Sequence, residues 1–173
     1  MKTKIEFDFE MVMGIVHASR ELRHGGLRFS RAILIEKAIE KTSNLKYVGL
    51  DTTLGRDFEC PITKTRYECK GQDNLFQTNR TIWTNEFTLK NFMGNKSGPK
   101  KTYDYMILID QTRNAIAYTD YENSIKRWRT TTDGIKLKVD KTNMTYLAKD
   151  IKPASVDKVR SLYNTIVDEI FKL

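Results

Sequence analysis

Residues 56–71, with the sequence RDFECPITKTRYECKG, decide the fold that we expect for this chain. Residues 56–60 and 65–70 can pair as an antiparallel hairpin around a four-residue turn at 61–64. In that register Asp57 lies opposite Glu68, and Lys70 follows two residues later on the same face. The hairpin therefore gathers two carboxylates and an ammonium group.

The alternation of side chains along the hairpin predicts which residues are buried, because successive residues of a strand point to opposite faces. Glu59 lies opposite Arg66 and is expected to form a cross-strand ion pair with it. The core-facing set is Phe58, Cys60, Tyr67 and Cys69, and the opposite set is Asp57, Glu59, Arg66, Glu68 and Lys70. The two cysteines are on the order of 13 Å apart along the ladder, too far for a disulfide.

Asp57 and Glu68 would repel each other in this hairpin. Carboxylates about 5 Å apart repel by roughly 3 kcal/mol at an effective dielectric constant near 20. A divalent cation between them reverses the sign, and hard oxygen ligands favour Mg²⁺. Lys70 could then orient an attacking water, lower its pKa, or stabilise the charge that develops at phosphorus. A structural reading also exists, because Glu-x-Lys is common on exposed strand faces.

The rest of the chain predicts an α/β (α+β) fold with a central mixed β-sheet flanked by helices, in a single domain of residues 1–173. The helical periodicity favours three helices. They cover residues 6–23, residues 31–42 after a Ser30 cap, and residues from Pro153 to the end. The strands are expected at 46–51, 103–110, 114–121 and, as an edge guarded by lysines, 136–140. Residues 72–102 are expected to be loop or partner-facing.

The spacing of Asp57 from the Glu68-Cys69-Lys70 strand resembles the motif of the PD-(D/E)XK nuclease superfamily. The size and the order of elements are most similar to a small type II restriction endonuclease with a restriction-endonuclease-like core. The resemblance implies that Asp57 and Glu68 bind Mg²⁺ and that Lys70 is the catalytic lysine. Arg56 stands where the superfamily usually has proline, so Asp51 and Glu59 are alternatives for the first acid.

The resemblance also implies further partners and residues. Such enzymes often recruit one more acid from a preceding helix, and Glu36 or Glu40 could serve, although each could instead be a solvated helix residue. A homodimer would read a palindrome and cut both strands to leave 5′-phosphate ends. A cognate DNA methyltransferase would accompany a restriction enzyme.

The composition agrees with a nucleic-acid partner. The chain has 30 Lys and Arg against 22 Asp and Glu, a formal charge of +8, and such an excess favours a polyanion. Base readout is expected from residues after the hairpin, and phosphate contacts from scattered basic residues. The readout candidates are Asn79, Arg80, Trp83, Thr84 and Asn85, and the phosphate candidates are Lys100, Lys101, Arg127, Arg129, Lys136 and Lys138.

Other classes of protein are less well supported by the sequence. Acidic residues interrupt the apolar N-terminal segment, which disfavours a secretory signal, and we expect a cytoplasmic protein. Two cysteines and two histidines in separate regions disfavour a zinc site. Two alternatives stay open: a nuclease that acts on branched or damaged DNA, and a non-enzymatic DNA-binding regulator that uses the two N-terminal helices.

Overall fold

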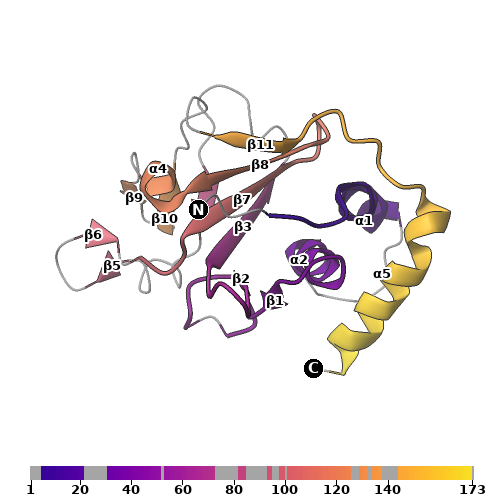
Figure 1. The fold of residues 1–173 in the computed structure, drawn as a ribbon, viewed down its shortest axis with the longest axis horizontal. Coiled ribbons are helices and arrows are strands. Elements are labelled where there is room, and N and C mark those ends of the chain that lie inside the picture. The colour runs from indigo at the N-terminus through magenta and orange to yellow at the C-terminus, as the bar shows by residue number, and fades with distance from the viewer. Residues whose placement is uncertain are drawn as a thin grey trace.

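The computed structural model shows an α/β protein in which a six-stranded mixed sheet is accompanied by helices (Figure 1). It describes residues 5–21, 31–51, 53–72, 82–84, 93–94, 98–99, 101–125, 129–131, 134–137 and 144–172. Within these ranges there are four helices: α1 (Phe9–Glu21), α2 (Arg31–Lys41), α4 (Tyr121–Ile125) and α5 (Val156–Phe171). None of them is long and apolar enough to cross a membrane.

The main sheet has the strand order β1-β2-β3-β7-β8-β11. Its strands are β1 (Lys46–Tyr47), β2 (Phe58–Glu59), β3 (Arg66–Gln72), β7 (Tyr105–Asp110), β8 (Ala115–Asp120) and β11 (Thr145–Ala148). Strands β3 and β7 are parallel, and every other neighbouring pair is antiparallel. The pairing of β3 with β7 places the predicted catalytic strand in the middle of the sheet.

The core lies between this sheet and the three long helices. Helices α1 and α2 pack against each other and against α5, and α2 also contacts β1 and β3. Figure 1 shows α5 on the outer side of the α1–α2 pair. The helices bury the apolar stripes that the sequence predicts, since Val12, Ala38, Ile39, Val159 and Ile166 have no exposed surface.

The ends of the helices follow ordinary capping chemistry. The Ser155 side chain caps α5 by accepting a hydrogen bond from the Lys158 N–H at 3.3 Å. The Ala154 N–H donates to the Glu10 carbonyl at 3.0 Å, which fixes the start of α5 against α1. A Cβ on Gly14 would come within 2.7 Å of the Ala154 carbonyl, so glycine permits this close contact.

Two predictions about the strands are wrong. The segment 72–102 contains β4 (Ile82–Thr84), β5 (Met93–Gly94) and β6 (Gly98–Pro99), where we expected loop. The predicted edge strand is β10 (Gly134–Leu137), which is the central strand of a separate sheet ordered β4-β10-β9, with β9 at Arg129–Thr131. The edges of the main sheet are instead β1 and β11, and the sequence did not predict β11.

Candidate active site

The hairpin has the predicted register. Phe58 pairs with Tyr67 and Glu59 pairs with Arg66. Phe58 and Tyr67 are almost completely buried, and Cys60 and Cys69 are buried free thiols. The apolar face of the hairpin therefore packs into the core as the alternation of the sequence predicts.

Asp57 lies just before β2, outside the two register pairs that join β2 to β3. Its N–H donates to the Tyr67 carbonyl at 2.9 Å, and its Oδ2 accepts from the Cys69 N–H at 2.8 Å. The carboxylate thus reaches across to β3 and binds a backbone group there. Burial, followed by repulsion from Glu68 and Glu36, raises the pKa of Asp57 well above its usual range.

Glu68 and Lys70 lie on β3 beside this carboxylate. The Glu68 side chain is 7 % exposed, and its Oε1 lies 2.6 Å from the Lys70 Nζ. Burial by itself lowers the pKa of Lys70, but the opposing effects of the Glu68, Asp57 and Glu36 carboxylates raise it above its ordinary value. Lys70 therefore remains a cation at neutral pH, surrounded by acids.

Glu36 is the third acid of the cluster, and it comes from α2. It is buried, and burial raises its pKa to about 7, an effect that the Tyr47 hydrogen bond opposes and the Glu68 charge reinforces. Of the two helical acids that the sequence offered, the structure brings this one to Asp57, Glu68 and Lys70. The alternative reading of Glu36 as a solvated helix residue is wrong.

The other candidate acids have different partners. Glu40 accepts the Tyr47 N–H at 2.9 Å through one oxygen and binds the Lys37 Nζ at 2.9 Å through the other. It thereby links α2 to β1. Asp51 is exposed and accepts from the N–H and hydroxyl of Thr53 at 3.1 and 2.5 Å. Neither side chain is among the groups that shift the pKa values of the acid cluster.

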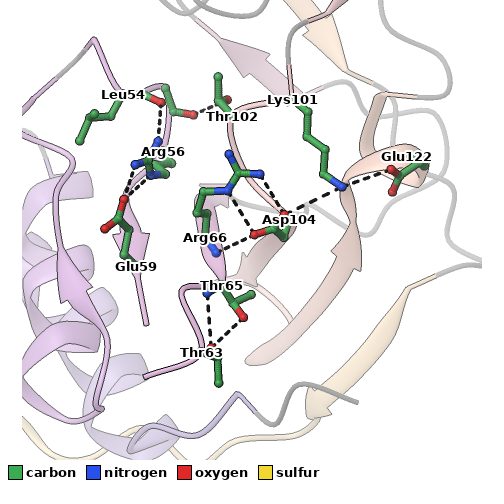
Figure 2. A network of polar contacts seen from close by, with 11 residues as sticks. Leu54, Arg56, Glu59, Thr63, Thr65, Arg66, Lys101, Thr102, Asp104 and Glu122 are labelled. Carbon is green, nitrogen blue, oxygen red and sulfur yellow. Dashed lines mark hydrogen bonds and ion pairs between the residues drawn. The ribbon is translucent and has the colours of Figure 1, made fainter. Parts of the chain in front are cut away.

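Glu59 belongs to a polar network on the outer side of the hairpin, which Figure 2 shows. It binds Arg56, with the Arg56 Nε 2.8 Å from its Oε1, whereas the Arg66 Nη2 lies 3.0 Å from the Asp104 Oδ1. The predicted ion pair of Glu59 with Arg66 is therefore wrong, although their register is right. The network fixes the segment before Asp57 on one side and joins β3 to the start of β7 on the other.

The network also includes the loop before the hairpin and Lys101, a predicted DNA-binding residue (Figure 2). The Thr102 hydroxyl donates to the Gly55 carbonyl at 2.7 Å. Lys101 is exposed, with its Nζ 3.5 Å from a Glu122 oxygen and 3.9 Å from an Asp104 oxygen. The charge of Lys101 is therefore already shared between two carboxylates of its own chain.

Most of the predicted DNA-binding residues fall outside the part of the chain that the structure describes. These are Asn79, Arg80, Asn85, Lys100, Arg127 and Lys138. The backbone of four others is described in the three-stranded sheet: Trp83 and Thr84 on β4, Lys136 on β10 and Arg129 on β9. Lys136 is paired with Trp83 on one side and with Arg129 on the other. Three of the predicted residues therefore occupy one row of register positions.

The donor set of the acid cluster can be compared with what Mg²⁺ requires. Across the residues that the structure describes, no three His, Cys, Asp or Glu side chains are close enough to hold a metal ion by themselves. Mg²⁺ is commonly bound through one or two carboxylates, with water and substrate phosphate completing the octahedron. Asp57 and Glu68 supply two hard oxygen ligands of this kind, so the residues fit Mg²⁺ and do not form an all-protein cage.

Two residues of this region were missed by sequence reasoning. The Tyr47 hydroxyl makes a hydrogen bond with the Glu36 side chain. A Cβ on Gly49 would lie 2.6 Å from the Tyr47 ring and 2.9 Å from the Asp57 Oδ1. Neither residue carries a sequence signal of its own, because their positions depend on how α2, β1 and the hairpin pack.

Comparisons with known proteins identify no relative of this chain. The chain matches no protein-family model, and it has no significant match among curated proteins or solved structures.

Proposed function

We propose that this protein is a Mg²⁺-dependent, sequence-specific endonuclease of double-stranded DNA, a type II restriction enzyme with a restriction-endonuclease-like core. The observation that carries the proposal is the cluster of Glu36, Asp57 and Glu68 around Lys70. The cluster joins a helix, the entrance of the hairpin and the catalytic strand. Enzymes that hydrolyse phosphodiester bonds with bound metal ions use the same residue types.

The electrostatics of the cluster support a functional origin. Three ionised carboxylates and one ammonium would leave two uncompensated negative charges in a mostly buried site. Burial is the largest cause of the raised pKa values of Asp57 and Glu36, and repulsion from Glu68 adds to it. Perturbed ionisable groups of this kind concentrate at functional sites, and a divalent cation would relieve the repulsion.

The four residues of the cluster divide three roles in the proposed reaction. Asp57 and Glu68 would hold Mg²⁺, and Glu36 would be the additional acid. When bound, Mg²⁺ supplies Lewis-acid activation of the scissile phosphate and of water. Lys70 would orient the attacking water and stabilise the negative charge that develops on the phosphoryl oxygens. Glu68 keeps the Lys70 ammonium in place through their 2.6 Å contact.

Two further features support DNA as the substrate. The formal charge of +8 favours a polyanion. The three-stranded sheet holds Trp83, Lys136 and Arg129 at neighbouring register positions, and aromatic and basic residues together are typical of nucleic-acid contacts. In this proposal two copies of the chain form a homodimer that cuts both strands, in a restriction system with a cognate methyltransferase.

The experiment is to incubate the purified protein with a sequenced plasmid, with Mg²⁺ and with EDTA, and to map the ends. We expect discrete fragments with 5′-phosphates that appear only with Mg²⁺. Asp57→Asn should abolish cutting and preserve DNA binding, whereas the matched variant Asp51→Asn, which changes an exposed acid on the same connection, should cut normally.

The other outcomes identify the alternatives. Cutting of four-way junctions or damaged duplexes, with intact plasmid left uncut, would indicate a structure-specific nuclease. Sequence-specific binding that is unaffected by Mg²⁺, with no cleavage of any DNA, would indicate a regulator. Full activity of Asp57→Asn would refute the proposed site.

A further inference from the structure

Tyr47 is held by α2 at three points. Its hydroxyl makes a hydrogen bond with the Glu36 side chain, and its backbone N–H donates to the Glu40 Oε1 at 2.9 Å. The Lys37 Nζ lies 5.2 Å from the centre of its ring, within the range of a cation–π contact. The Tyr47 side chain on β1 is therefore fixed relative to α2, the helix that carries Glu36.

The Tyr47 ring also contacts the hairpin. The ring centroid lies 5.7 Å from that of Phe58, which is fully buried. Gly49 packs so closely between Tyr47 and Asp57 that a Cβ would lie 2.6 Å from one and 2.9 Å from the other. Tyr47 thus spans the distance between the acid from α2 and the acid from the hairpin.

We infer that Tyr47 is a positioning residue, whose hydroxyl holds the Glu36 carboxylate toward Asp57 and Glu68 where Mg²⁺ would bind; this inference rests on the proposed function. Glu36 is the cluster member that enters from a helix, so its placement depends on the contact between α2 and the sheet. The loss of a group that orients a metal-site acid without touching the metal typically weakens metal affinity.

Isothermal titration calorimetry with MgCl₂ on the full chain, in the absence of DNA, tests the inference. Tyr47→Phe removes one hydroxyl and keeps the ring that contacts Phe58 and Lys37. We expect its Kd for Mg²⁺ to rise by about 10- to 100-fold, with its melting temperature in EDTA close to that of the wild type. Tyr118→Phe is the matched control, because its half-buried ring packs against Tyr105 at 5.8 Å; its Kd should not change.

Gly49→Ala provides a second, independent variant. Its added methyl group would displace the Tyr47 ring or the Asp57 carboxylate, and it should also weaken Mg²⁺ binding. In cleavage assays Tyr47→Phe should require a higher half-saturating Mg²⁺ concentration and recover at saturation, with unchanged DNA affinity in EDTA. A purely structural role would not shift the metal requirement in this way.

The outcomes separate this inference from the proposed function. Wild-type affinity in Tyr47→Phe refutes the positioning role and leaves the nuclease proposal intact. A fall in melting temperature with no change in Kd assigns Tyr47 a structural role and also refutes the inference. A wild-type protein that binds no Mg²⁺ and cuts no DNA refutes the proposed function, and the inference with it.

Discussion

Lys70 Nζ lies 2.6 Å from Glu68 Oε1. The two residues belong to one strand, and only Cys69 separates them in the sequence. The pair occupies the central strand β3, and only 23 % of the Lys70 side chain is exposed. The ammonium also lies within the electrostatic reach of Asp57 and Glu36. Lys70 is thus the counterion of three acids, a position that suits both structural stability and catalysis.

Replacement of Lys70 separates those two roles. Lys70→Met keeps the length of the side chain and removes the charge, so we expect the cleavage rate to fall by about 10²- to 10³-fold. The loss of the counterion should also lower the free energy of unfolding at pH 8 by about 3 kcal/mol. Single-turnover cleavage and urea denaturation measure the two effects.

Lys46→Ala is the control for this prediction, because Lys46 is an exposed lysine on the edge strand β1 of the same sheet. It should change the free energy of unfolding by no more than about 0.5 kcal/mol. The cleavage rate should change by no more than the equivalent of that energy. A Lys70→Met protein that cuts at the wild-type rate would show that the ammonium takes no part in the reaction.

The sequence was sufficient to predict the hairpin because its information is local. The turn at 61–64 fixes the register of Phe58 with Tyr67, and the alternation of residues then assigns the buried face. The strands at Tyr105–Asp110 and Ala115–Asp120 were predictable for the same reason, since a short turn joins two apolar runs. Local periodicity also located the long helices.

Features that depend on distant packing were not predictable. The sequence offered both Glu36 and Glu40 as the helical acid, and the packing of α2 against β1 and β3 selects Glu36. Lysines at the predicted edge strand suggested an exposed ladder, yet β10 pairs with strands on both sides. The role of Tyr47 appears only when β1, α2 and the hairpin are placed together.

The raised pKa of Glu36 predicts how stability depends on pH. The folded protein retains a proton up to about pH 7, whereas the unfolded chain releases it near 4.5. Because the folded state binds more protons in this window, the free energy of unfolding should fall as the pH rises from 4.5 to 7. The fall should total about 3.5 kcal/mol, at about 1.4 kcal/mol per pH unit over 2.5 units.

Glu36→Gln should remove this part of the pH dependence. Urea denaturation in EDTA at several pH values should show the variant more stable than the wild type at pH 8, with the difference shrinking as the pH approaches 4.5. Asp51→Asn is the contrasting control, because hydrogen bonds from Thr53 lower the pKa of Asp51 and its loss cannot produce a gain at high pH. Parallel curves for Glu36→Gln and the wild type would contradict a buried, ionising Glu36.

Asp57→Asn should be more stable than the wild type in EDTA and less stable than the wild type in saturating Mg²⁺. In EDTA the variant avoids the burial of a charged carboxylate and is relieved of repulsion from Glu68 and Glu36. Its amide oxygen can still accept the Cys69 N–H, so it should melt above the wild type. At 100 times the Kd, Mg²⁺ stabilises the wild type by about 2.7 kcal/mol, equivalent to roughly 5–10 °C. The variant should gain little.

Differential scanning calorimetry with EDTA, MgCl₂ and NaCl of matched ionic strength measures this reversal. The NaCl sample separates specific binding from general screening of charge. An equal rise in melting temperature for both proteins in MgCl₂ would place any bound metal away from Asp57.

The row of register positions on the three-stranded sheet predicts how DNA binding responds to salt. Lys136 is paired with Trp83 and with Arg129, and a lysine in such a row is expected to neutralise one phosphate. Lys136→Ala should therefore reduce the slope of log K against log salt concentration by about 1, with a similar loss of affinity for every sequence. Lys152→Ala, at an exposed position before α5, should leave the slope unchanged.

Fluorescence anisotropy in EDTA with a labelled duplex, titrated between low and moderate salt, measures both slopes. An unchanged slope for Lys136→Ala would mean that the DNA lies elsewhere on the protein, because the release of counterions reports directly on the phosphates that the protein contacts.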